Sequence, residues 1–226
     1  MEIKVMNAEK YICWDLDRTL GNFENTERHQ TRYGRSVATG FSIKTGIKEL
    51  LNELSERSFT HYVTTSATME YAIDALNSSG LEKYFRGVFD RHDVAMYDHG
   101  KCYKPVIKDI GIDEGMAPGR MIVIGDLPSD IPIDVNDMVF IEYAGCWKAH
   151  SSIIKDIIDT ILKESRGSFS YGFKKLYDMA DKKTGRRFIN LPDGTYLELE
   201  YRESTNDGKT FNVPTITSIE TPKRIF

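Results

Sequence analysis

Two carboxylates one residue apart, directly after a short apolar run, constrain this chain most. Residues 10–14 have the composition of a buried strand, and Asp15 and Asp17 follow them. Positions i and i+2 of a strand share a face, so the two acids can converge on one point once the chain bends past Asp15. Close carboxylates repel each other unless a cation or a shared proton relieves the repulsion. The stretch therefore indicates a Mg²⁺ site or a nucleophile with an acid/base partner, and a turn in which the acids only cap a helix is the alternative.

Two later apolar runs, residues 59–63 and 121–124, also end in polar side chains. The polar residues that follow them are Thr64, Thr65, Asp126 and Asp130. A hydroxyl at a strand end, before a helix, is typical of phosphate binding and also of a simple N-cap. The glycine before Asp126 allows a tight turn there.

Helical spacing of apolar residues alternates with the strand-like runs. Helices are predicted over residues 47–54, 69–76, 106–110 and 151–162, with further strands over 87–89 and 138–141. This alternation predicts βαβ units, and hence an α/β fold with a parallel sheet covered by helices on both faces. Ligands bind at the carboxyl ends of such strands, so the acids and hydroxyls are expected to meet at one edge of the sheet.

Composition bounds the class of protein. With 226 residues, 40% hydrophobic and 28% charged, the chain fits one α/β domain of about 150 residues plus an appendage. The net charge of −4 argues against a DNA-coating protein, so nucleic acid is expected only as a substrate. No apolar run approaches the roughly 20 residues that span a bilayer, and the N-terminus lacks a signal layout. Three scattered cysteines predict no disulfide framework, and we expect a cytoplasmic protein without membrane partners.

The character of the chain changes near residue 165, which predicts two units. Residues 1–164 are expected to form the core, with a polar flap loop at residues 21–44 over the strand ends. Residues 165–226 are expected to form a small α+β appendage, with a helix, antiparallel strands and a hairpin turn at residues 206–209. The appendage is a candidate cover for the site, or an interface through which the chain forms a homo-oligomer.

Taken in order, the strand ends resemble the motifs of the haloacid dehalogenase-like (HAD) superfamily of phosphohydrolases, over roughly residues 9–163. The four motifs are matched by Asp15-Leu16-Asp17-Arg18-Thr19-Leu20, by Thr65, by Lys104, and by Gly125-Asp126 with Asp130. Thr64 is an alternative at the second position and Lys101 at the third. The resemblance implies the HAD-like Rossmannoid three-layer fold and a phosphorylated substrate.

The same resemblance implies the catalytic roles. Asp15 would be the nucleophile that forms an aspartyl-phosphate, and Asp17 would be the general acid and then the general base. Thr65 and Lys104 would hold the phosphoryl oxygens where charge shifts in the transition state. The second acid indicates a phosphatase, since the dehalogenases of the superfamily lack an aspartate at that position.

Mg²⁺ is the cofactor that the resemblance implies. It would be held by Asp15, by the backbone carbonyl of Asp17 and by Asp126. Asp130 would orient the lysine or a metal-bound water.

The spaces between the motifs leave no room for a full cap domain, so the resemblance implies a capless member with an open site. Such members tend to act on bulky or macromolecular phosphorylated substrates. Arg18 stands where many members carry glycine, which bears on the turn beside the site. Two alternatives stay open: a phosphotransferase of the same fold, and a catalytically silent scaffold that serves as a binding module.

Overall fold

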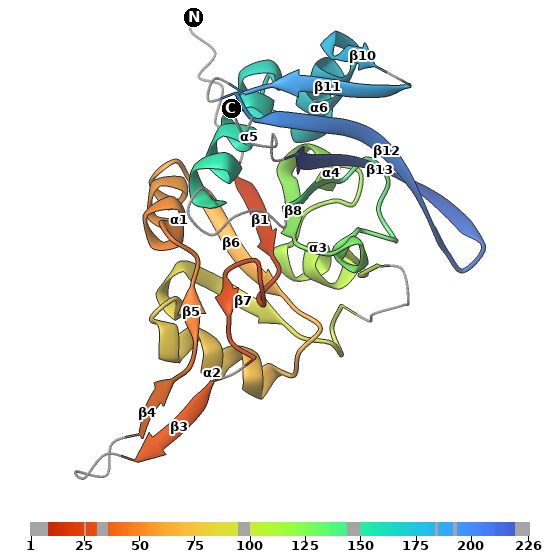
Figure 1. Cartoon of the computed structure of the whole chain (residues 1–226). Coiled ribbons are helices and arrows are strands. Elements are labelled where there is room, and N and C mark those ends of the chain that lie inside the picture. Colours follow the sequence, from red (N-terminus) through yellow and green to blue (C-terminus); the bar gives the residue numbers. More distant parts are fainter. Residues whose placement is uncertain are drawn as a thin grey trace, which may run out of the picture.

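The computed structural model describes residues 9–24, 26–30, 36–94, 100–143, 150–183, 185–191 and 194–219. Within these residues, nine strands form one sheet in the order β10-β11-β12-β13-β9-β8-β1-β6-β7 (Figure 1). The strands are β1 (Lys10–Trp14), β6 (Phe59–Thr64), β7 (Phe85–Phe89), β8 (Met121–Gly125), β9 (Val139–Glu142), β10 (Asp181–Lys183), β11 (Arg186–Asn190), β12 (Tyr196–Asn206) and β13 (Lys209–Ile219). Neighbours pair in parallel from β13 to β7 and antiparallel from β10 to β13.

Helices cover both faces of this sheet. The helices are α1 (Ile47–Glu56), α2 (Met69–Ser79), α3 (Lys104–Ile110), α4 (Ala117–Arg120), α5 (His150–Glu164) and α6 (Phe169–Met179), with 3₁₀ turns η1 (Glu82–Tyr84) and η2 (Pro128–Asp130). The four predicted core helices and the predicted helix of the appendage are present, whereas the short α4 and the edge strand β10 were not predicted. In the described part of the chain, no helix combines the length and the apolar character that crossing a membrane requires.

The side chains of β1 point alternately to the two faces of the sheet, and this explains the two apolar layers. Ile12 and Trp14 are buried in one cluster, to which α1, α2, α5 and α6 contribute side chains. Tyr11 and Cys13 are buried in a second cluster with residues of α3 and α4. Successive side chains of a strand point to opposite faces, so a strand that is apolar throughout must be covered on both sides. The predicted α/β three-layer fold is confirmed.

The C-terminal segment extends the core sheet. β13 pairs in parallel with β9, with Thr215 opposite Phe140 and Ile216 opposite Ile141. β12, β11 and β10 then continue the sheet through antiparallel pairing, and the β12–β13 hairpin projects from the body in Figure 1. The predicted antiparallel strands are confirmed. The division near residue 164 and the role of the segment as a site cover stay predictions.

The flap segment has regular structure that its sequence did not indicate. It contains two short antiparallel pairs, β2 (Gly21–Asn22) with β5 (Ser42–Ile43) and β3 (Glu27–Gln30) with β4 (Ser36–Thr39). In Figure 1 the β3–β4 pair projects away from the sheet. The β2–β5 pair follows directly from the turn after β1, so it lies beside the carboxyl end of that strand.

Candidate active site

The turn after β1 sets Asp15 at the edge of the sheet. Its amide donates to the carbonyl of Ile124 at 2.8 Å, which continues the ladder with β8. Arg18 then takes a left-handed conformation with φ 63°, and its amide donates to the carbonyl of Gly21 at 2.5 Å. A left-handed conformation costs a residue with a Cβ about 1 kcal/mol. The arginine in place of the usual glycine is therefore accommodated by the turn at a modest cost.

Lys101 lies at the centre of a buried cluster of charges. Its Nζ atom lies 2.7 Å from Asp15 Oδ1 and 2.6 Å from Asp130 Oδ1. It also donates to the carbonyl oxygen of Thr64 at 3.0 Å, and the side chain is 1% exposed. Buried charges persist in proteins when they are paired and hydrogen-bonded. The ammonium group is therefore fixed by three segments that are far apart in the sequence.

The backbone around Lys101 is clamped by a second segment. The Lys101 amide donates to the carbonyl of Ile131 at 2.9 Å, and the Ile133 amide donates to the carbonyl of Lys101 at 3.1 Å. A Cβ atom on the preceding residue, Gly100, would lie 2.2 Å from Ile133 Cγ2 and 2.5 Å from the Ile131 carbonyl oxygen. The glycine permits the close approach that directs the lysine into the cluster.

Lys104 lies outside this cluster. It is the first residue of α3, its side chain is 49% exposed, and its Nζ atom lies 3.0 Å from Glu114 Oε2. Lys104 begins a helix, as the third motif of the resemblance implies. The lysine that lies beside Asp15 is instead Lys101, three residues earlier. The geometry therefore favours Lys101, the alternative at the third motif position, because Lys101 contacts Asp15 and Asp130 whereas Lys104 pairs with Glu114, and the catalytic role of the lysine stays a prediction.

Three acids lie together at this site, and two of them contact Lys101. Asp15, Asp126 and Asp130 are all buried, and each offers a carboxylate oxygen within 4.8 Å of the others. Burial raises the pKa of the Asp126 carboxyl to about 6, and the charge of Asp130 adds to this rise. Burial also raises the pKa of Asp15, against the opposing effect of the Lys101 ammonium.

The three carboxylate oxygens form a set of ligand atoms that fits a divalent cation. The positive charges of Arg18 and Lys44 also act on Asp126, and the three ligand atoms that the acids offer are all oxygens. Mg²⁺ takes oxygen ligands and commonly uses one or two carboxylates together with substrate phosphate. The carboxylate of Asp17 does not belong to this group of three, and its backbone carbonyl stays a predicted ligand.

Gly125 allows Asp130 to reach the cluster. A Cβ atom at Gly125 would lie 2.4 Å from Asp130 Oδ2 and 2.6 Å from Asp130 Cβ. The same Oδ2 atom accepts a hydrogen bond from the Leu127 amide at 3.2 Å. The Gly-Asp-x-x-x-Asp spacing therefore has a steric reason: the second aspartate folds back over the glycine.

Both threonines at the end of β6 are buried. Thr64 is the last residue of the strand, and its carbonyl accepts from Lys101. The Thr65 amide donates to the carbonyl of Phe89 at 2.9 Å, and its Oγ1 atom accepts from the Ala67 amide at 3.1 Å. The Thr65 hydroxyl thus lies in the turn between β6 and α2, while its role and that of Thr64 stay predictions.

Asp17 is held from two sides. Its Oδ1 atom accepts a hydrogen bond from the Phe23 amide at 3.2 Å and another from the Tyr71 hydroxyl at 2.9 Å. Burial raises the pKa of this carboxyl, and the two hydrogen bonds oppose the rise. Tyr71 lies within the helix predicted over residues 69–76, and the sequence pattern gives it no role at the site. No local pattern could have revealed the contact, because 54 positions separate the two residues.

Comparison with known proteins places this arrangement in a family. The family model for haloacid dehalogenase-like hydrolases matches residues 9–133, which is more than half of the chain. The curated proteins include no match.

Solved structures show weaker similarity. A HAD-superfamily hydrolase from Ehrlichia chaffeensis is 15% identical, with a TM-score of 0.46, over 66% of this chain and 97% of that chain. A predicted phosphoglycolate phosphatase from Haemophilus somnus is 14% identical, with a TM-score of 0.45, over 63% and 91%. YfnB from Bacillus subtilis, described as a HAD hydrolase bound to magnesium, is 14% identical, with a TM-score of 0.42, over 60% and 86%. Scores this low carry no conclusion about the activity of this chain.

Proposed function

This chain belongs to the haloacid dehalogenase-like hydrolases, and we propose that it is a Mg²⁺-dependent phosphatase that cleaves phosphomonoesters through an aspartyl-phosphate. The observation that carries the proposal is the buried cluster in which Lys101 contacts both Asp15 and Asp130, with Asp126 beside them. Burying so many charged groups together costs stability, which is typical of a ligand-binding or catalytic site. The cluster also lies at the carboxyl ends of the strands, where α/β folds bind ligands.

Asp15 is the proposed nucleophile. Its carboxylate attacks phosphorus, a bond forms between that oxygen and phosphorus, and the bond from phosphorus to the ester oxygen breaks. Lys101 keeps the nucleophile oriented through its contact at 2.7 Å and offers positive charge to the phosphoryl oxygens. The Thr65 hydroxyl is the proposed second donor to those oxygens.

Asp17 is the proposed acid and base. In the first step its carboxyl gives a proton to the departing ester oxygen, so that an alcohol leaves. In the second step the resulting carboxylate takes a proton from the water that attacks the aspartyl-phosphate, which releases phosphate and restores Asp15. The hydrogen bonds from Phe23 and Tyr71 keep this carboxyl on the same side of the strand end throughout.

The residues proposed to hold Mg²⁺ are Asp15, Asp126 and Asp130, with the backbone carbonyl of Asp17. When bound, the cation neutralises charge that would otherwise separate an anionic nucleophile from an anionic phosphate. The three buried carboxylate oxygens, all within 4.8 Å of one another, support this assignment.

The proposed site is of the capless type. Between Asp17 and Thr65 the described chain contains two short strand pairs, α1 and the core strand β6, and between Thr65 and Lys101 it contains α2, η1 and β7. These elements support an open site suited to a bulky or macromolecular phosphorylated substrate.

Hydrolysis of p-nitrophenyl phosphate tests the proposal, measured with Mg²⁺ and with EDTA. We expect Mg²⁺-dependent release in the wild type, none with Asp15→Asn, and normal release with the control Asp109→Asn on the exposed side of α3. Faster release of nitrophenol when an alcohol acceptor is added, with phosphate found on the acceptor, would instead identify a phosphotransferase. Absence of turnover on this and a panel of other monoesters would contradict the proposal and favour a binding scaffold.

A further inference from the structure

Tyr71 reaches the proposed general acid from a different element. It lies in the first turn of α2, and its hydroxyl donates to Asp17 Oδ1 at 2.9 Å. Its ring is half-buried against the apolar cluster beneath α2. The hydroxyl is therefore not on a free surface side chain, since both the ring and the helix that carries it are fixed.

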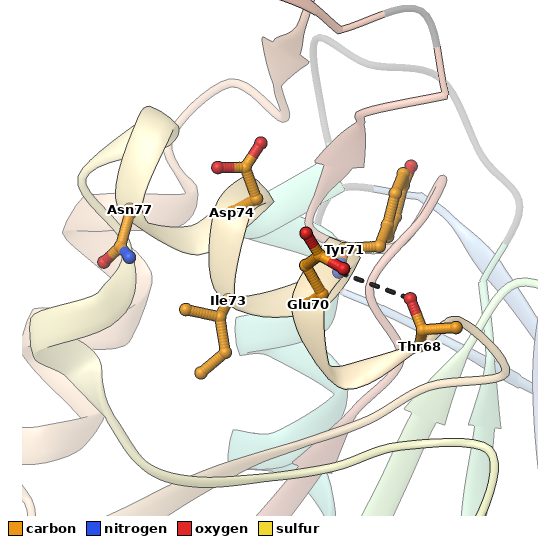
Figure 2. A pocket seen from close by; sticks show the side chains of 6 residues that line it. All are labelled: Thr68, Glu70, Tyr71, Ile73, Asp74 and Asn77. Atoms are coloured by element: carbon orange, nitrogen blue, oxygen red, sulfur yellow. Dashed lines mark hydrogen bonds between the residues drawn. The ribbon is translucent and has the colours of Figure 1, made fainter. Parts of the chain in front are cut away.

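The start of α2 is itself firmly capped. The Thr68 side chain accepts from the Tyr71 amide at 3.4 Å, and Asp90 Oδ2 accepts from the Met69 amide at 3.0 Å. Capping of this kind contributes about 1 kcal/mol and restricts fraying of the first turn. Figure 2 shows this hydrogen bond from the Tyr71 amide to the Thr68 side chain. It also shows the Tyr71 side chain extending from the helix away from Ile73.

A pocket adjoins the same tyrosine. It has a volume of about 780 Å³ and is lined by Thr68, Glu70, Tyr71, Ile73, Asp74 and Asn77 (Figure 2). Tyr71 lines this pocket and also contacts Asp17 through its hydroxyl.

The two carboxylate oxygens of Asp17 differ, because both hydrogen-bond donors contact the same one. Oδ1 accepts from both the Phe23 amide and the Tyr71 hydroxyl, so it is the poorer position for a proton. The transferable proton is then carried by Oδ2. We propose that Tyr71 is a positioning residue, which orients Asp17 so that Oδ2 delivers the proton to the ester oxygen of an alkyl phosphate; this inference rests on the proposed function.

The step needs no other reactant. As the bond from phosphorus to the ester oxygen breaks, its electron pair passes to that oxygen, which takes the proton from Asp17 Oδ2. A p-nitrophenolate ion leaves without protonation, whereas an alkoxide does not. Tyr71 therefore matters for esters of ordinary alcohols and much less for p-nitrophenyl phosphate.

The test compares kcat/KM of Tyr71→Phe on two substrates, p-nitrophenyl phosphate and glycerol phosphate. This ratio reports the steps up to departure of the alcohol, so the shared hydrolysis of the aspartyl-phosphate does not contribute. General acid catalysis contributes about 10²–10⁴-fold, and misorienting the acid should forfeit part of this. We expect about a tenfold loss on glycerol phosphate and less than about a threefold loss on p-nitrophenyl phosphate. Phenylalanine keeps the buried ring, so the fold is expected to survive, and thermal unfolding checks this.

Two further variants separate the outcomes. Tyr84→Phe, a half-buried tyrosine outside the site, should leave both ratios unchanged. Asp17→Asn should show the same selectivity as Tyr71→Phe, but larger. Equal losses of Tyr71→Phe on both substrates, or no loss, would overturn the inference while the phosphatase assignment stands. Lack of selectivity in Asp17→Asn, or no turnover by the wild type, would refute the proposed function and the inference with it.

Discussion

Replacement of Lys101 by methionine should remove both activity and a large part of the stability. Methionine keeps the length of the side chain but leaves Asp15 and Asp130 without the ammonium group that lies 2.7 Å and 2.6 Å from them. Loss of one partner from a buried ion pair costs about 3–5 kcal/mol, because the other charge stays buried and unpaired. Loss of a donor to the transition state costs about 10²–10³-fold in kcat.

The stability deficit of Lys101→Met should depend on pH. Burial already raises the pKa of Asp15, and removal of the ammonium group raises it further. A carboxyl whose folded pKa lies above its unfolded value takes up its proton in the folded state first, so its stabilising contribution is present at low pH and lost as the pH rises. The deficit should therefore be larger at pH 8 than at pH 6, and it should shrink by up to about 1.4 kcal/mol per pH unit for the proton taken up. Most of the change should fall above about pH 7, the pKa of Asp15 in the wild type, because below it both folded proteins bind the proton.

Lys104→Met is the matched control. Lys104 is half-exposed and pairs with Glu114 at 3.0 Å, and exposed pairs contribute about 0–1 kcal/mol. Urea unfolding followed by circular dichroism, in EDTA at both pH values, measures the free energy of unfolding, and hydrolysis of p-nitrophenyl phosphate with Mg²⁺ measures activity. Normal activity of Lys101→Met together with inactive Lys104→Met would refute the assignment of Lys101. A deficit that does not change with pH would refute the electrostatic explanation.

Two other substitutions test the structure around the site and its core. Gly125→Ala should cost about 1–3 kcal/mol and most of the activity, because the new Cβ would lie 2.4 Å from Asp130 Oδ2; an active variant of normal Tm would contradict this. His61 accepts a hydrogen bond from Trp14 in the core, and burial lowers its pKa to about 4. Since the unfolded state then binds a proton that the folded state does not, the wild type should lose up to about 3 kcal/mol relative to His61→Asn as the pH falls from about 6.5 to about 4. Urea unfolding of both proteins across that range measures the difference, and a constant difference would refute the assignment.

The fold could be predicted from local patterns because β1, β8 and β9 are mostly apolar and the longer helices each have one apolar face. The acids at the strand ends could be predicted for the same reason, because Asp15 directly follows β1 and Asp126 directly follows β8, with Asp130 four residues further on. The pairing of β13 with β9 could not be predicted, because the local sequence of a partly exposed strand does not indicate which strand it pairs with.

The lysine shows where sequence reasoning reached its limit. Lys104 begins α3 and so matched the expected position, whereas Lys101 lies in a segment without a helical pattern. What directs Lys101 inward is its backbone pairing with Ile131 and Ile133, which are distant in sequence. The contact of Tyr71 with Asp17 is non-local in the same way. Local patterns identified the elements and the acids, but the contacts between residues distant in sequence that orient the lysine and Asp17 could be found only from the structure.

The most direct test of the proposed mechanism is detection of a phosphoryl group on Asp15 during turnover. The enzyme is mixed with Mg²⁺ and p-nitrophenyl phosphate, whose leaving group needs no general acid, and is then quenched rapidly in acid, digested and analysed by mass spectrometry. The mechanism predicts one phosphoryl group on Asp15 in the wild type, more of it in Asp17→Asn because hydrolysis lacks its base, and none in Asp15→Asn. Turnover with a phosphoryl group on another residue, or turnover by Asp15→Asn, would contradict the role of Asp15 as the nucleophile.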